Sequence, residues 1–140
     1  MPLLCRTLNL IGVTLTAVLT VSCSSGPKLT PVRGKVLYGG QPAEGAVVVF
    51  HRKDSEPNNP TPSGTVLADG SFTLHTHPHG NGAPPGEYTV VITWYPPNAR
   101  ELENPHNKLP ARYASVAESP LKVIVGAEPT VLEAFDIPAK

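Results

Sequence analysis

Apolar and polar residues alternate along short stretches of the chain from residue 32 onward. The clearest stretch, GEYTVVITWY (residues 86–95), places Tyr88, Val90, Ile92 and Trp94 on one face, as a strand half-buried in a sheet does. Six further stretches have strand length and are rich in Val, Ile, Phe, Tyr and Thr. The pattern therefore predicts seven strands, at residues 32–38, 46–52, 65–67, 71–76, 86–95, 121–125 and 130–137.

Gly and Pro residues separate these stretches at short intervals. The chain contains 17 prolines and 12 glycines, which leave no uninterrupted length for a long helix beyond the N-terminal region. Asp69-Gly70 supplies the positive φ that a tight hairpin needs. The polar connection at residues 96–120 allows a short helix around Ala99 to Glu103, which Pro105 would end. We expect an all-β domain over residues 32–138, folded as a seven-stranded antiparallel β-sandwich.

The first 22 residues have a different pattern. Arg6 and the terminal amine precede a continuous apolar run from Leu8 to Val21, and small residues and a cysteine follow. This order is typical of an export signal that is cleaved. A retained transmembrane anchor is the alternative, but a run of roughly 14 apolar residues falls short of the roughly 20 that cross the hydrocarbon core as a helix. We expect residues 1–22 to be a signal peptide.

The sequence LTVSCSSG, which follows the apolar run, resembles the bacterial lipobox. In that motif, small residues precede a cysteine that receives diacylglycerol on its sulfur and becomes the mature N-terminus. Val21, Ser22 and Cys23 fit the motif, whereas Thr20 stands where an aliphatic residue is usual. The resemblance implies lipidation of Cys23, and plain secretion after a cut near Ser22 is the alternative.

Lipidation would also account for the cysteine content. Cys5 lies in the segment expected to be removed, which leaves Cys23 as one cysteine in an oxidising compartment where exposed pairs normally form disulfides. Residues 23–31 would then be an acylated, palmitate-carrying N-terminus and a polar tether, with the membrane as partner. Ser24 resembles the neutral residue that favours outer-membrane sorting in many bacteria. We expect an exported protein of the cell envelope, anchored on the outer membrane or on the membrane that faces the periplasm.

Charge excludes one class of partner. Lys and Arg together number 11, as do Asp and Glu, so the formal net charge at pH 7 is zero. A neutral chain lacks the basic field that gathers phosphate backbones. We therefore expect no nucleic acid partner.

Three histidines, His75, His77 and His79, stand two residues apart in LHTHPHGNG and are a candidate metal site. On a continuing strand, neighbouring members of this set would lie about 6.5 to 7 Å apart, which is too wide for two of them to ligate one ion. Pro78 and Gly80 can bend the chain, and imidazole suits Zn(II) and Cu(II). The alternative is a polar hairpin loop in which histidine is merely soluble, since no Cys, Asp or Glu stands nearby to complete a shell.

Trp94 and Tyr95 are the second candidate site. Exposed aromatic rings stack on sugars, so the pair would suit a carbohydrate-binding module if both rings were exposed. Period two, however, places Trp94 with Tyr88 and Ile92 on the inner face. Core packing is therefore the expected role of Trp94.

The sequence VRGKVLYGGQPAEGAVVVF (residues 32–50) resembles the opening of the carboxypeptidase regulatory-like domain. Matching residues are Val32, Gly34, Val36, Gly40, Pro42, Gly45, Ala46, Val48 and Phe50, and ADGSFTL (residues 68–74) resembles a hairpin of the same family. The resemblance implies a transthyretin-like, immunoglobulin-like sandwich in a small bacterial lipoprotein. It implies no catalysis, because the zinc of the carboxypeptidases lies in a separate domain. Hydroxyisourate hydrolase, a relative of the same fold, ends in Y-R-G-S, whereas this chain ends in DIPAK.

The sequence contains no G-x-S-x-G elbow, no Walker loop and no C-x-x-C pair. We expect a protein that is not an enzyme, a membrane-anchored lipoprotein that serves as a binding, adhesion or scaffolding module. Its partner would be a protein or a glycan at the cell envelope. The alternatives are a periplasmic metal-binding protein that uses His75, His77 and His79, and a carbohydrate-binding module.

Overall fold

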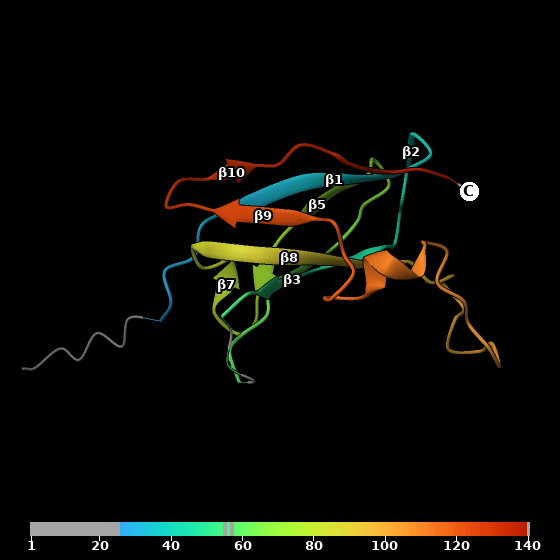
Figure 1. Ribbon diagram of the computed structural model, residues 1–140, viewed down its shortest axis with the longest axis horizontal. Coiled ribbons are helices and arrows are strands. Elements are labelled where there is room, and N and C mark those ends of the chain that lie inside the picture. Colours follow the sequence, from blue (N-terminus) through green and yellow to red (C-terminus); the bar gives the residue numbers. More distant parts are fainter. Residues whose placement is uncertain (1–25, 55, 57, 140) are drawn as a thin grey trace, which may run out of the picture.

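The computed structural model describes residues 26–139, apart from residues 55 and 57. The expected signal peptide and Cys23 lie outside these residues. The described part is almost entirely β-structure, with one short 3-10 helix, η1 (Ala111–Ala114) (Figure 1). No helix in this described part has the length and hydropathy needed to cross a bilayer.

The first sheet is built around strand β1 (Val32–Tyr38). Strands β10 (Thr130–Val131) and β11 (Phe135–Ile137) pair with β1 in parallel on one edge, the former with its beginning and the latter with its end. Strands β2 (Gln41–Pro42) and β5 (Ser71–Thr73) pair with β1 antiparallel on the other edge. Every other strand of this five-stranded sheet thus has β1 as its partner.

The second sheet is antiparallel throughout its described strands and has six of them. Their spatial order is β7 (Gly80–Asn81), β6 (His75–Thr76), β4 (Ser63–Thr65), β3 (Val47–Arg52), β8 (Gly86–Thr93) and β9 (Lys122–Val125). The β3–β8 pair is the longest, with register from Val47↔Thr93 to Arg52↔Tyr88. It forms the centre of this sheet.

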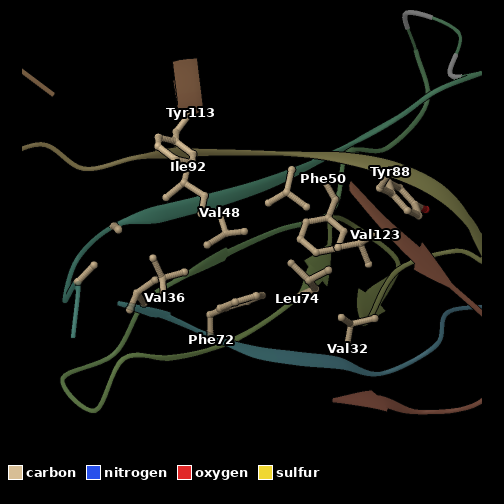
Figure 2. Close-up of a cluster of buried hydrophobic side chains, with 14 of the residues drawn as sticks. Val32, Val36, Val48, Phe50, Phe72, Leu74, Tyr88, Ile92, Tyr113 and Val123 are labelled. Carbon is tan, nitrogen blue, oxygen red and sulfur yellow. The ribbon is translucent and has the colours of Figure 1, made fainter. Parts of the chain in front are cut away.

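The two sheets share one hydrophobic core, which gives the domain a sandwich-like architecture. Figure 2 shows Val48 and Phe50 of β3 facing Val36 of β1 and Phe72 of β5 across this core. All four side chains are buried. The alternation expected for residues 86–95 is confirmed, because Tyr88, Val90 and Ile92 are buried and Trp94 packs against the same core.

The expected all-β class is confirmed, whereas the expected strand inventory differs in detail. The described residues form eleven short strands in place of seven, and the first sheet is not purely antiparallel, because β10 and β11 run parallel to β1. The expected strand at 130–137 is broken into these two pieces. Strand β4 lies at Ser63–Thr65, two residues earlier than predicted.

The expected strand at residues 71–76 is divided between the two sheets. Strand β5 pairs with β1 in the first sheet, and after Leu74 strand β6 pairs with β4 and β7 in the second. Leu74 is fully buried at the crossing point. A period-two pattern shows which face a residue occupies, and it carries no information on which sheet a strand joins. The division was therefore not visible in the sequence.

The long connection after β8 forms turns and η1. Residues 97–101 form turns, with Glu101 N–H donating to the carbonyl of Asn98 at 2.9 Å, so the helix allowed around Ala99 to Glu103 does not form. Tyr113 of η1 is buried and lies above Ile92 (Figure 2). The connection thereby closes one end of the core.

Candidate functional site

The domain has two ends with different residues, and the N-terminal segment joins the domain at one of them. Residues 26–30, the N-terminal segment, lie at one end of the long axis, and the connection containing η1 lies at the other (Figure 1). The N-terminal end also carries the last residue of β3, Arg52, which pairs with Tyr88 near the start of β8. The opposite end carries Val47, Thr93 and Trp94.

Backbone hydrogen bonds fix the N-terminal segment to the domain. Thr30 N–H donates to the carbonyl of Ala83 at 2.8 Å, and Ala83 N–H donates back to the carbonyl of Thr30 at 2.9 Å. The Thr30 hydroxyl donates to the carbonyl of Gly126 at 2.8 Å. A Cβ at Gly82, whose φ is +110°, would overlap the carbonyl of Thr30. Glycine is therefore required there on both conformational and steric grounds.

The three predicted histidines lie beside this docking point, on the β6–β7 hairpin (residues 75–81). His75 is on β6, and His77 and His79 are in the turn that leads to β7. The turn contains a cis His77-Pro78 peptide bond, and His79 N–H donates to the carbonyl of Thr76 at 2.7 Å. All three imidazoles are exposed. The chain therefore turns back after Thr76 and does not continue as a straight strand.

The hairpin brings two of these imidazoles close to each other. The ring centroids of His75 and His77 are 6.4 Å apart, with their planes 37° apart. Within residues 26–139, apart from 55 and 57, no three His, Cys, Asp or Glu side chains are grouped as metal ligands. His75, His77 and His79 are therefore not gathered around one point as a three-ligand centre.

Asn81 orients one of these rings. Nδ1 of His75 lies 3.0 Å from Oδ1 of Asn81, across the β6–β7 pair. An amide oxygen only accepts hydrogen bonds, so this contact places the proton of a neutral His75 on Nδ1 and leaves the lone pair of Nε2 free. Sequence reasoning did not include Asn81, because its pairing with His75 depends on the closed hairpin.

A small pocket of about 130 Å³ lies at the same end. Its lining combines aromatic rings, prolines and polar side chains, from Pro27, Phe50, Arg52, Asn59, Pro60, Thr61, Pro84 and Tyr88. The rings of Phe50 and Tyr88 pack with centroids 5.7 Å apart. The N-terminal segment and the end of β3 thus line the same pocket. The alternation of apolar and polar residues gave no sign that these two parts of the sequence lie together.

Tyr88 is held as a neutral structural group. Burial raises the pKa of Tyr88 above its usual value, and the charge of Arg52 partly opposes this effect. The Tyr88 hydroxyl donates to the carbonyl of Pro84 at 2.6 Å. A phenol with a raised pKa and a committed proton is poorly suited to general base catalysis at neutral pH.

The opposite end holds the predicted aromatic pair, and only one member is packed. Trp94 lies edge-on to Tyr38, with ring centroids 5.8 Å apart, and its Nε1 donates to the carbonyl of Glu44 at 2.8 Å. Nζ of Lys108 lies 4.5 Å from the centroid of the Trp94 ring. Tyr95, in contrast, is 45% exposed. Core packing of Trp94 is confirmed, and no flat pair of free rings is formed.

Arg112 and Tyr113 anchor the connection to the core. The Arg112 guanidinium lies 5.0 Å from the centroid of the Tyr113 ring, and its Nη2 donates to the Tyr113 hydroxyl at 3.2 Å. Tyr113 is buried against the core.

In the comparisons with known proteins, no family model matches the chain, and no curated protein matches it significantly.

Proposed function

We propose that this chain is a lipid-anchored protein of the bacterial cell envelope, acylated on Cys23 after removal of residues 1–22. Its domain would hold a partner and perform no catalysis. We also propose that the domain is a transthyretin-like sandwich of the carboxypeptidase regulatory-like kind. The positive φ of Gly45 and Gly70 and the packing of Phe72 against Gly34 support this assignment, because these glycines occupy positions where a side chain would strain or collide.

The observation that carries the proposal is the spacing between Cys23 and the folded domain. Thr30 is already bonded to Ala83 and Gly126, so only residues 24–29 separate the expected lipid attachment site from fixed structure. Seven residue steps span at most about 25 Å. Such spacing suits a domain that works close to the membrane surface.

The opposite end is the part that a partner beyond the membrane would reach. Seven large apolar side chains are exposed among the described residues. Two of them, Ile124 and Val131, lie on β9 and β10, and the other five lie at this end or in the connection that covers it: Val47, Leu67, Tyr95, Leu102 and Val116. Exposed apolar side chains contribute to protein–protein contacts, with aromatic residues especially favoured. They support a binding or scaffolding role directed away from the anchor.

Metabolic labelling with palmitate tests the anchor. The wild-type protein should incorporate label and sediment with membranes, and Cys23→Ala should do neither. A wild-type protein without label, or label that survives in Cys23→Ala, would contradict the proposal.

Photo-crosslinking in the native envelope tests the holding role. A photoreactive residue at Tyr95 or Leu67 should give a defined adduct, and the same residue at Glu87, on the outer face of β8, is the control. Adducts of equal yield and identity at all three positions would indicate random collisions. Binding of the soluble domain to a glycan array, lost in Tyr95→Ala, would instead favour the carbohydrate-binding alternative.

Metal binding is the second candidate function, and the contact between His75 and Asn81 favours it. A hydrogen bond to one ring nitrogen commonly orients the other toward a metal. Two imidazoles that share one ion at tetrahedral angles have ring centroids roughly 5 Å apart, from metal–nitrogen distances near 2.0 to 2.1 Å. The exposed rings of His75 and His77, 6.4 Å apart, need only a modest rotation to reach this separation.

Calorimetry with Zn(II) and Cu(II) tests the metal candidate. Micromolar affinity that falls at least tenfold in His77→Ala, with a smaller loss in Asn81→Ala, would support it. His106→Ala is the matched control, because His106 lies in the distant connection and should leave the affinity unchanged. Millimolar affinity, or equal affinity in all variants, would rule the site out.

A further inference from the structure

The N-terminal segment lies against the β6–β7 hairpin before it reaches Thr30. A Cβ at Gly26 would lie 3.5 Å from Nδ1 of His79, and a Cβ at Gly80 would lie 4.0 Å from Cδ1 of Leu29. Pro27 lines the pocket beside Arg52 and Tyr88. The chain therefore lies beside the domain from Gly26 onward, four residues before its first sheet-like bridge.

The covalent distance to the expected lipid is consequently much shorter than the tether suggests. Gly26 is three residue steps from Cys23, which span at most about 11 Å. The polar headgroup layer of each leaflet is roughly 5 to 8 Å thick. With a diacylglycerol on Cys23, the turn beside Gly26 cannot lie far beyond the headgroups.

We propose that one defined surface of the domain lies against the lipid headgroups of the anchoring bilayer. We call it the headgroup surface, and its exposed members are Lys28, Asn59, Pro60, His77, Pro78 and His79. This inference rests on the proposed acylation of Cys23. It adds an orientation: the β6–β7 hairpin faces the bilayer, and the connection containing η1 faces away.

The chemistry of the headgroup surface suits contact with polar lipid and not insertion into hydrocarbon. Its side chains are an ammonium, an amide, imidazoles and proline rings, and the ammonium, amide and imidazoles can donate hydrogen bonds to phosphate or ester oxygens. Nearby, the cations Arg52 and Lys53 stand with the anions Asp54 and Glu56, so these opposite charges offset each other. Chain length, rather than net charge, therefore holds this surface at the membrane, and a zwitterionic bilayer suffices.

The cysteine content makes this orientation directly measurable. In the mature acylated protein Cys5 is gone and the Cys23 thiol is consumed, so an introduced cysteine is the sole thiol. Variants His79→Cys and Leu67→Cys place a fluorophore at the headgroup surface and at the opposite end. The labelled, acylated proteins are reconstituted in phosphatidylcholine vesicles that contain a headgroup-linked quencher lipid.

We expect most of the emission to be lost at position 79 and little at position 67. His77→Cys serves as a second probe of the headgroup surface, and far-ultraviolet circular dichroism confirms the β fold of each variant. Equal quenching at both ends, or stronger quenching at position 67, would overturn the inference while flotation with the vesicles still upholds the anchor. A protein that fails to float would overturn both.

A longer tether tests whether chain length is the cause. Insertion of 16 Gly and Ser residues between Ser25 and Gly26 adds an average reach of roughly 20 Å. The inserted protein should still float but lose most of the quenching at position 79. Undiminished quenching would overturn the role of the tether and point to intrinsic affinity of the surface for headgroups.

Discussion

The N-terminal end and the opposite end of this domain are stabilised in different ways. At the N-terminal end, main-chain groups approach one another closely, as at Thr30 and Ala83 and at Gly82. At the opposite end, side chains pack against one another: Tyr38 contacts the Trp94 ring edge-on, and Lys108 lies over the same ring. The close main-chain approach at Gly82 is thus compared with the side-chain packing around Trp94.

This difference predicts different responses to substitution. Where backbones touch, an added carbon atom has nowhere to go, because the colliding atoms belong to the main chain. Where side chains pack, truncation of a side chain weakens the domain by an amount that grows with the cavity it leaves. The following substitutions compare the two ends, in order of decreasing effect.

Gly82→Ala should be the most damaging change at the N-terminal end. The new Cβ would overlap the carbonyl of Thr30, and φ of +110° is unfavourable for alanine, so we expect a loss of about 4 kcal/mol in the free energy of unfolding. Urea unfolding measures it. Gly126→Ala is the matched control, since a Cβ there meets nothing within 4 Å. Similar losses in both variants would show that close approach at Gly82 is not the cause.

Trp94→Ala should cost about 2 to 3 kcal/mol, because the ring is only partly buried and its edge-on packing with Tyr38 is removed. Tyr95→Ala, next to it and 45% exposed, should stay within about 0.5 kcal/mol of the wild type. Thermal unfolding of the two variants gives the comparison. A larger effect for Tyr95→Ala would mean that the opposite end is packed differently from this description.

Thr76→Val should cost about 1 kcal/mol at the N-terminal end. The Thr76 side chain is fully buried, and its hydroxyl donates to the carbonyl of Gly82 at 2.7 Å, so valine keeps the shape and removes the bond. Thr73→Val, on the exposed face of β5, is the control and should change little. Equal urea midpoints for Thr76→Val and the wild type would argue against a contribution from this bond.

Asp69→Asn should have the smallest effect, and that effect should depend on pH. The Ser71 hydroxyl, at 2.6 Å, and then the Ser71 N–H, at 3.0 Å, donate to the Asp69 carboxylate and lower its pKa. A carboxyl with a lowered pKa in the folded state contributes stability above its unfolded value, near 3.9, and loses it as pH falls through the folded value. Melting temperatures from pH 6 to pH 2 should therefore converge for wild type and Asp69→Asn at the acid end. Asp136→Asn controls for the loss of a charge, and a constant difference across this range would contradict the assignment.

Much of the fold could be predicted from the sequence, but the structures of the two ends were not equally predictable. Alternation identified the buried face of β8, and Asp69-Gly70 marked a turn with Gly70 at φ +84°. The parallel pairing of β11 with β1 and the crossing at Leu74 depend on which strands meet in space. Period two specifies faces and leaves strand partners open.

The candidate sites divide in the same way. The outward direction of His75 and the inward packing of Trp94 follow from alternation alone. The contact of His75 with Asn81 and the proximity of His79 to Gly26 require the closed hairpin and the docked N-terminal segment. Such contacts join residues far apart along the chain, or across a turn of unknown shape, so no local pattern predicts them.

The parallel arrangement of β1 with β10 and β11 has a mechanical consequence. Under the proposed anchor, a pull between the N-terminus and a partner bound at the opposite end would be directed along β1, while the interstrand hydrogen bonds lie across it. Force then shears many bonds at once and does not unzip them one by one. A domain that holds its partner under tension would therefore resist mechanical unfolding better because of this strand direction.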